Sequence, residues 1–306
     1  MKAPSILVIK LAALGDFALA FGPFAAIRAH HPAARITLLT TPPFAPLARL
    51  SPWFDEVWED GRPAARDLGG LLRLAGRLRA ARFDRVYDLQ TSGRSSRYRL
   101  FVGARAEWSG IARGASHPHA NPARDSMHTI DRQREQLEMA GITQFPAPDL
   151  GWLDADLTRF GLPERFAVLV PGAAPSRPAK RWPMERFAAL AAVLPLPSVV
   201  IGARGEAPLA AAIRAAQPDA VDLTGRTALT DIAAIARRAA FAVGNDTGPM
   251  HLLAACGCPG LTLFGADSDP ALCAPRASGG IHLRRIPLSA LTIEEVRDAI
   301  AAAGFA

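Results

Sequence analysis

Cysteine is scarce in this chain of 306 residues, which contains only Cys256, Cys258 and Cys273. An odd number of closely spaced cysteines offers no disulfide framework. The C-x-C pair with a single later Cys also matches none of the common zinc-binding spacings, and no pair of histidines accompanies it. We therefore expect reduced thiols and no metal site here.

Long apolar runs are also missing. The longest near the N-terminus, residues 17–27, is interrupted by Gly22 and Pro23 and is shorter than the roughly 20 residues that a membrane-spanning helix requires. Residues 6–9 are too few for the core of a signal peptide, and Asp16 follows soon after them. These features predict a cytoplasmic protein.

Negative charge is sparse between residues 62 and 113. Twelve arginines in this segment stand against four acidic residues, Asp67, Asp84, Asp88 and Glu107, an excess of eight positive charges. Such an excess forms either a solvated helix face or a surface for a polyanion, namely nucleic acid, an acidic glycan or an anionic membrane leaflet. Because the sequence contains no zinc-finger spacing, RNA-recognition aromatics or basic zipper, we expect no nucleic-acid partner.

Short apolar runs alternate with segments of helical periodicity along the whole chain. This alternation predicts an α/β fold, with parallel sheets covered by helices on both faces. The expected strands are residues 6–9, 35–40, 85–89, 167–170, 198–201, 241–243 and 260–264. The expected helices are residues 17–31, 68–81, 184–194, 206–216, 231–240 and 293–303.

A segment rich in Pro, Gly and Asp, residues 141–164, separates two such series of strands and helices. We therefore expect two lobes, 1–160 and 161–290, and a closing helix in 291–306 that can pack back on the first lobe. Chain length agrees with two domains of about 150 residues. In folds of this kind, ligands bind at the carboxyl ends of the strands.

The segment 243–251, VGNDTGPMH, leads from an apolar strand into a polar turn and a helix. Pro249 suits the first turn of a helix, because the N–H group that it lacks needs no helical partner there. Thr247 and Gly248 would leave backbone N–H groups at the positive end of that helix, which favours an anion. From these residues alone, an ordinary helix capped by Asp246 or Thr247 is equally consistent.

Four segments in the same order resemble glycosyltransferase family 9, the lipopolysaccharide heptosyltransferases. They are GNDTGPMH (244–251) followed by LFG (263–265), the strand and Gly-Asp turn ILVIKLAALGD (6–16), the loop PGAAPSRPAKRWP (171–183), and DLQTSGR (88–94). The resemblance covers nearly the whole chain. It implies a GT-B fold of two Rossmann-like parallel-sheet lobes facing across a cleft. It further implies an ADP-sugar donor, inversion at the anomeric carbon, and no metal or other cofactor.

The resemblance assigns Asp16 the role of general base. An inverting transfer needs one base that takes the proton of the acceptor hydroxyl as it attacks the sugar. Asp16 follows the first strand, where a carboxylate can face a ligand. Its sequence context also fits an N-cap of a helix that begins at Phe17, and without the resemblance that interpretation would be favoured.

The predicted donor-binding residues lie in the second lobe. Lys180 is one of only three lysines, with Lys2 and Lys10, in a chain that otherwise uses arginine, and a compact ammonium suits a diphosphate leaving group. Glu206 follows a strand and can accept hydrogen bonds from a ribose, or can simply complement a helix dipole. The full predicted set is Lys180, Glu206, Asp246, Thr247, Gly248, Pro249, Met250 and His251.

The predicted acceptor-binding residues are Gln90 and Arg94, in the segment that the family directs toward the acceptor. Family members often carry two serines where this chain has Ala12 and Ala13, so any contacts through those hydroxyls are absent. Two Asp-x-Asp triplets, 154–156 and 267–269, have carboxylates of the kind that hold Mg²⁺, but we interpret both as loop residues.

These features together predict an inverting, metal-independent transferase. It would move a heptose or related sugar from an ADP-sugar to an anionic glycolipid acceptor of the lipopolysaccharide core type, with peripheral contact to the inner membrane. The alternatives are a sister GT-B enzyme that uses another nucleotide sugar or glycan acceptor, and a catalytically silent protein that only binds nucleotide sugars.

Overall fold

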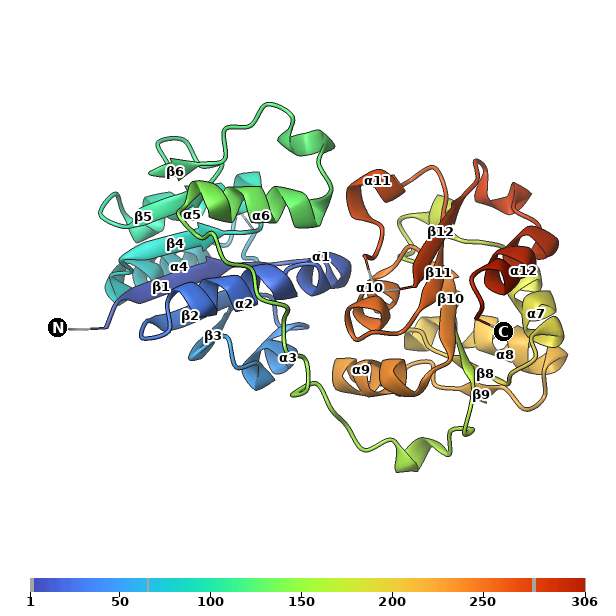
Figure 1. The fold of residues 1–306 in the computed structure, drawn as a ribbon. Coiled ribbons are helices and arrows are strands. Elements are labelled where there is room, and N and C mark those ends of the chain that lie inside the picture. The colour runs from blue at the N-terminus through green and yellow to red at the C-terminus, as the bar shows by residue number, and fades with distance from the viewer. Residues whose placement is uncertain (1–2, 65, 277–278, 306) are drawn as a thin grey trace. The chain divides into compact units, whose positions relative to one another are not determined.

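The computed structural model describes residues 3–64, 66–276 and 279–305. Packing divides the chain into two units, Met1–Trp152 and Leu153–Ala306, each an α/β domain (Figure 1). The division lies within the Pro/Gly-rich segment 141–164, eight residues before the expected boundary at 160.

The first unit is built on a six-stranded sheet in the order β3-β2-β1-β4-β5-β6, with every neighbouring pair parallel. The central strands are nearly continuous apolar runs because helices cover both faces of the sheet. The strands are β1 (Ser5–Ile9), β2 (Arg35–Thr40), β3 (Glu56–Glu59), β4 (Arg85–Asp88), β5 (Glu107–Gly110) and β6 (His117–Pro118).

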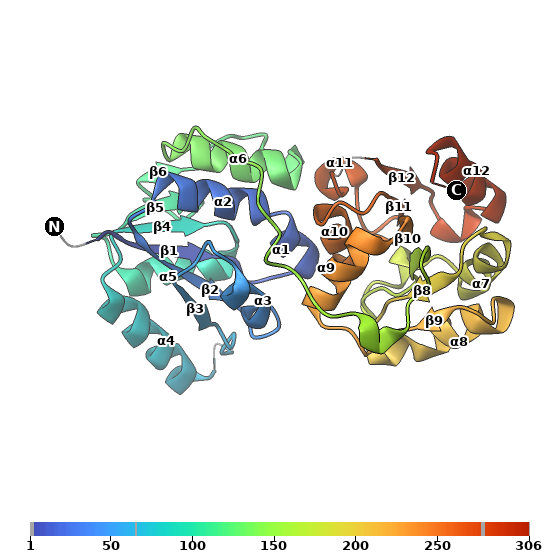
Figure 2. The ribbon, with the colours of Figure 1, turned by 60° about the horizontal axis from the view of Figure 1, so that its bottom comes forward.

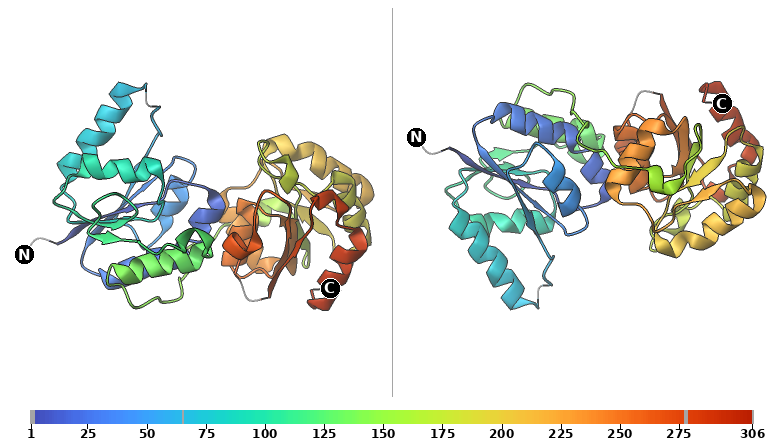
Figure 3. Two further views of the ribbon diagram at one scale, coloured as in Figure 1. Left: turned by 90° about the horizontal axis from the view of Figure 1, so that it is seen from above. Right: turned by 90° about the horizontal axis from the view of Figure 1, so that it is seen from below.

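Helices cover the two faces of this first sheet. Helices α4 (Leu68–Ala81) and α5 (Gly93–Val102) lie on one face, and α2 (Phe21–His30) and α6 (Thr129–Met139) lie on the other (Figure 3). The short α1 (Leu14–Ala18) follows β1, and α3 (Ala45–Leu50) connects β2 to β3. Leu74 and Leu78 of α4 pack with Leu7 and Ile9 of β1 in the core.

The expectation of one helix over residues 17–31 is wrong, because the chain forms α1 and α2 with a break at Leu19 and Ala20. The cause is local. Pro23 has no N–H group, and its ring collides with the carbonyl of Leu19, four residues earlier, if the helix continues through it. Within the first turn of a new helix that begins at Phe21, Pro23 is tolerated.

The second unit repeats this topology. Its six-stranded parallel sheet has the order β12-β11-β10-β7-β8-β9. Counted within the unit, this is the 3-2-1-4-5-6 order of a Rossmann fold, as it is in the first unit. The strands are β7 (Ala167–Val170), β8 (Ser198–Val200), β9 (Val221–Asp222), β10 (Phe241–Asn245), β11 (Gly260–Phe264) and β12 (Gly280–Arg284).

Helices α7 (Met184–Val193) and α8 (Ala207–Ala216) cover one face of the second sheet, and α9 (Leu229–Arg238) and α10 (Gly248–Ala255) cover the other (Figure 2). A short helix, α11 (Pro270–Cys273), precedes β12. The final helix, α12 (Ile293–Ala302), packs against α7, and its Val296 and Ile300 join the core of this unit. Helix α12 therefore contributes to the core of the second unit.

The strand order reverses between β1 and β4 in the first unit and between β7 and β10 in the second. In open α/β sheets, ligands bind at this switch point, beyond the carboxyl ends of the strands. All four motif segments of the sequence lie there, because they follow or end β1, β4, β7 and β10. Of the helices in the described part of the chain, none is both long enough and apolar enough to cross a membrane.

Candidate active site

In the first unit, the loop after β4 fixes the turn after β1. The side-chain oxygen of Gln90 accepts hydrogen bonds from the backbone N–H groups of Leu11 (2.8 Å) and Ala12 (3.1 Å). The buried Lys10 donates from Nζ to the carbonyl of Leu89, at 3.1 Å. Gln90, which the sequence assigns to the acceptor, thus uses its oxygen to hold the segment that leads to Asp16.

Asp16 is the third residue of α1, not the N-cap of a helix that starts at Phe17. The helix begins at Leu14 with Ala13 as its N-cap, and Oδ2 of Asp16 accepts the N–H group of Ala13, at 3.2 Å. The side chain is partly exposed. The structure therefore combines the two interpretations, because Asp16 closes the first turn of α1 and still has carboxylate oxygen available for a ligand.

Two cations lie near Asp16. Burial lowers the pKa of Lys10 and of Arg132, and the negative charge of Asp16 opposes this effect at both residues. Lys10 is fully buried after β1, and Arg132 is half-buried on α6. Asp16 therefore lies within electrostatic reach of two cations of the first unit.

Asp88, the last residue of β4, is a buried carboxyl to which sequence reasoning gave no role. Its Oδ1 accepts the N–H groups of Gln90 (3.2 Å) and Thr91 (3.0 Å). Burial raises its pKa to about 7, although these hydrogen bonds and the charge of Lys10 act in the opposite direction. Asp88 thus shapes the turn that presents Gln90.

A pocket of about 380 Å³ lies beside the turn before Asp16. It is lined by Ala12, Ala13, Leu14 and residues 41–44 and 60–62. Arg94, the second predicted acceptor residue, is at the start of α5 and donates through both terminal nitrogens to the carbonyl of Pro63, at 3.4 Å. Arg94 therefore lies next to the loop that follows this pocket.

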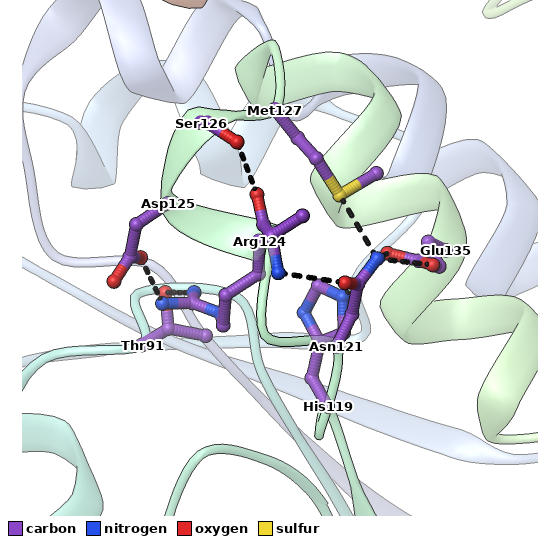
Figure 4. Close-up of polar contacts among 9 residues, drawn as sticks. Thr91, His119, Asn121, Arg124, Asp125, Ser126, Met127 and Glu135 are labelled. Atoms are coloured by element: carbon purple, nitrogen blue, oxygen red, sulfur yellow. Dashed lines mark hydrogen bonds and ion pairs between the residues drawn. The ribbon is translucent and has the colours of Figure 1, made fainter.

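The loop between β6 and α6 carries a polar network that the sequence did not indicate (Figure 4). The amide nitrogen of Asn121 donates to both carboxylate oxygens of Glu135, at 2.8 and 3.0 Å. The same carboxylate also lies 2.9 Å from Nε2 of the buried His119. Arg124 donates to Oγ1 of Thr91, at 3.1 Å. The network fastens this loop to α6 and to the turn after β4. The pairs are 14 to 33 positions apart, so no local pattern could predict them.

In the second unit, three predicted donor residues form a linked charge group at the end of β10. The Lys180 ammonium lies 2.5 Å from Oδ2 of Asp246, and Nε2 of His251 lies 3.2 Å from Oδ1. Burial alone would raise the pKa of Asp246, but its hydrogen bonds with His251 and Lys180 outweigh burial and hold the pKa below its ordinary value. Asp246 is therefore an ionised bridge that orients Lys180.

The start of α10 presents backbone donors. Thr247 is its N-cap residue in extended conformation, and its hydroxyl makes no cap hydrogen bond but donates to the carbonyl of Asn245, at 3.2 Å. The helix begins at Gly248, and Pro249 lies in its first turn, as the sequence predicts. The side chain of Met250 packs in the core against Gly244 and Gly260, so Met250 can offer a ligand only its backbone.

Asn245 folds the 171–182 loop over the end of β10. Its buried amide donates to the carbonyls of Pro171 (2.8 Å) and Gly172 (3.3 Å), and its oxygen accepts the N–H group of Trp182, at 3.0 Å. This brings Lys180 to Asp246. Asn245 stands inside the most informative motif, but its residue type alone could not distinguish a ligand contact from this supporting role.

Glu206 lies across the carboxyl ends of β7 and β8. Its Oε2 accepts the N–H group of Ala203, at 2.7 Å, and its carboxylate occupies the space where a β-carbon on Gly172 would stand. The side chain is partly exposed. Glu206 is thus placed at the ligand-binding edge of the sheet, just before the first residue of α8.

The two Asp-x-Asp triplets have local roles. Asp154 accepts the N–H group of Ala155, and Asp156 accepts both donors of Thr158, at 2.9 Å. Asp269 caps α11 through the N–H group of Ala271 and pairs with Arg284, at 3.3 Å. These three carboxylates are engaged in turns and a cap, as loop residues commonly are.

Comparison with known proteins places these features in one family. Residues 71–286, more than half of the chain, match the model of glycosyltransferase family 9 (heptosyltransferase). The chain belongs to glycosyltransferase family 9. The resemblance inferred from the four motif segments is thereby confirmed, and the chain is a glycosyltransferase.

Solved family 9 structures share the fold. A family 9 glycosyltransferase from Veillonella parvula matches with a TM-score of 0.81 and 22% identity over 98% of this chain and 97% of that one. The ADP-heptose lipopolysaccharide heptosyltransferase II of E. coli matches with 0.77 and 23%, over 98% of both chains. The E. coli heptosyltransferase WaaC with ADP matches with 0.75 and 20%, over 98% and 99%. The expected GT-B fold is confirmed.

A relative of known function matches only in part. Lipooligosaccharide heptosyltransferase 2 of Haemophilus influenzae is 34% identical over 99 residues, which is 30% of this chain and 29% of that protein. The chain therefore aligns with less than a third of that relative's length. This match agrees with the family assignment, but it is too short to identify the donor or the acceptor.

Proposed function

We propose that this family 9 enzyme transfers a heptose or related sugar from an ADP-sugar to a hydroxyl of an anionic glycolipid of the lipopolysaccharide core type. Transfer would proceed with inversion and without a metal. The observation that carries the proposal is the Lys180–Asp246–His251 group beside the start of α10. It joins a fixed cation to a helix N-terminus, the combination that binds a diphosphate.

The donor half of the proposal rests on the second unit. An ammonium has three donors, and Lys180 directs contacts to Oδ2 and the carbonyl of Asp246, which leaves capacity for a phosphate oxygen. Glu206 can accept from the ribose hydroxyls at the ends of β7 and β8. E. coli WaaC was solved with ADP and with ADP-2-deoxy-2-fluoro heptose, which supports an ADP-linked donor.

The acceptor half rests on the first unit. The acceptor hydroxyl attacks the anomeric carbon on the face opposite the ADP, the bond from that carbon to the diphosphate oxygen breaks, and the hydroxyl proton passes to Asp16. Lys180 and the N–H groups at the start of α10 stabilise the charge that develops on the departing diphosphate. Arg132, the half-buried cation near Asp16, suits an anionic acceptor.

The test is binding followed by transfer. Calorimetric titrations with ADP, UDP and GDP in EDTA should show tightest binding of ADP, and mass spectrometry should detect heptose added to a lipopolysaccharide-core acceptor from ADP-heptose. Tighter binding of UDP or GDP than of ADP would identify a different nucleotide sugar as the donor. Binding of ADP-heptose without transfer to any hydroxyl acceptor would instead support a silent nucleotide-sugar-binding protein.

A further inference from the structure

Helix α4 has an apolar stripe that the fold of the first unit does not use. Leu74 and Leu78 are buried in the core, whereas Leu68 and Leu72 are 68% and 72% exposed. The two exposed leucines are four positions apart and therefore share one face of the helix. Single exposed leucines are ordinary, but the helix in contact with α4, α5, also carries an exposed leucine, Leu100 (71%). Figure 3 shows α4 and α5 side by side.

Cations accompany these leucines. Arg66, Arg73 and Arg79 are exposed around the same helix, and Arg97 is exposed on α5. Within the described part of the chain, neither Arg66, which precedes α4, nor Arg73 and Arg79 on it makes an ion pair with a carboxylate, and of the twelve arginines in 62–113 Arg85 alone does. This surface thus combines apolar side chains with guanidinium groups that form no ion pair with a carboxylate in the described part of the chain.

The position of α4 relates this surface to the acceptor side of the first unit. In a parallel sheet, the helix that follows a strand begins at the carboxyl edge of the sheet. Both α1, which carries Asp16, and α4 begin at this edge, so Leu68 and Leu72 lie toward it. A pocket of about 270 Å³ borders the first turns of α4 and is lined by Glu59, Asp60, Asp67 and Arg73 among others.

We propose that the outer face of α4, with Leu68, Leu72, Arg66, Arg73 and Arg79, docks the protein on an anionic membrane leaflet. The leucines would enter the boundary between headgroups and acyl chains, and the arginines would bind lipid phosphates. Neither signal alone gives stable anchoring, but the two together do. Docking through this surface would bring the carboxyl edge of the first sheet, with Asp16, close to a lipid-linked acceptor. This role in acceptor delivery rests on the proposed function, whereas the membrane docking itself does not.

The experiment measures co-sedimentation of the full chain with phosphatidylcholine vesicles, with and without phosphatidylglycerol. Wild type should bind only the anionic vesicles, and high salt should release it. L68Q/L72Q and R73E/R79E should each weaken binding by about tenfold or more, since one basic residue near a leaflet contributes roughly fivefold. The matched control is V193Q, which changes a residue 54% exposed on α7 of the second unit and should bind as wild type.

Equal binding to neutral vesicles, or unchanged binding of both double variants, would overturn the proposal. A dimer that L68Q/L72Q converts to a monomer, without vesicle binding by wild type, would identify the leucines as a subunit contact instead. Melting temperatures verify that the variants fold. Transfer to a delipidated acceptor should be equal in wild type and variants. If wild type transfers to no acceptor, the proposed function fails while the vesicle result still decides the docking surface.

Discussion

The ammonium of Lys180 lies 2.5 Å from Oδ2 of Asp246, although 66 positions separate the two residues. This pair exists because Asn245 folds the loop after β7 over the end of β10. A buried carboxylate held by two partners fixes the direction of the lysine before any ligand arrives. Preorganised charge of this kind stabilises a developing anion without reorganisation during the reaction.

Lys180→Ala should weaken ADP binding by about 10- to 100-fold, the loss expected for one hydrogen bond between charged groups. Titration calorimetry in EDTA measures the ADP dissociation constants of wild type and variant. The matched control is Arg177→Ala, which removes an exposed cation of the same loop and should leave affinity nearly unchanged. Binding that appears only with Mg²⁺ would contradict the metal-free site.

Asp16→Asn should reduce sugar transfer by about 10²–10⁴-fold, the usual contribution of one acid–base group. An Asn oxygen can still accept the N–H group of Ala13, so the melting temperature and ADP affinity should change little. All three quantities are measured on the two proteins. A stable variant with near-normal turnover would show that Asp16 only stabilises the first turn of α1 and is not the base.

Gln90→Leu removes the acceptor of two backbone N–H groups and should loosen the turn before Asp16. We expect kcat to fall by about 10- to 100-fold with a smaller change in the acceptor KM, because misplaced catalytic groups reduce turnover. Gln90→Glu, which keeps an oxygen acceptor, should recover part of the loss. If only the acceptor KM rises and kcat is unchanged, Gln90 binds the acceptor, as the sequence suggests.

Asp88→Asn should alter how stability depends on pH. The folded-state pKa of Asp88 is about 7, above that of an unfolded aspartate, so the folded state binds the extra proton between pH 4 and 7. Stability from this group is therefore fully present below pH 4 and decreases as pH rises toward 7, by up to about 1.4 kcal/mol per unit. Unfolding curves from pH 4 to 8 should be flatter for the Asn variant. Parallel curves would contradict the raised pKa.

Gly172→Ala should displace Glu206, because the new β-carbon would occupy the position of its carboxylate. The flexible end of Glu206 can move, so we expect a folded protein whose ADP affinity falls by about tenfold, as for Glu206→Ala. Gly205→Ala is the control, since nothing lies within 4 Å of its added carbon. Equal ADP affinity in all three variants would exclude Glu206 from the nucleotide site.

The sequence by itself determined the strands whose apolar runs are covered on both faces. Residues 35–40, 167–170 and 260–264 form strands with the expected bounds, because a buried parallel strand is apolar along its whole length. The helix over residues 68–81 was equally clear from its periodicity. The outer strands β3 and β12 were missed, since one partner and partial exposure leave them with mixed polar and apolar residues.

Only the tertiary structure decided what the site residues contact. The segment 243–251 predicted a strand, a turn and a helix start, because these are local features, and an anion site there stays a prediction. The bonds from Leu11 and Ala12 to Gln90, which span 79 and 78 positions, arise because β1 and β4 are neighbours, a consequence of strand order. The raised pKa of Asp88 likewise follows from burial, and burial is a property of the packed sheet rather than of any one segment.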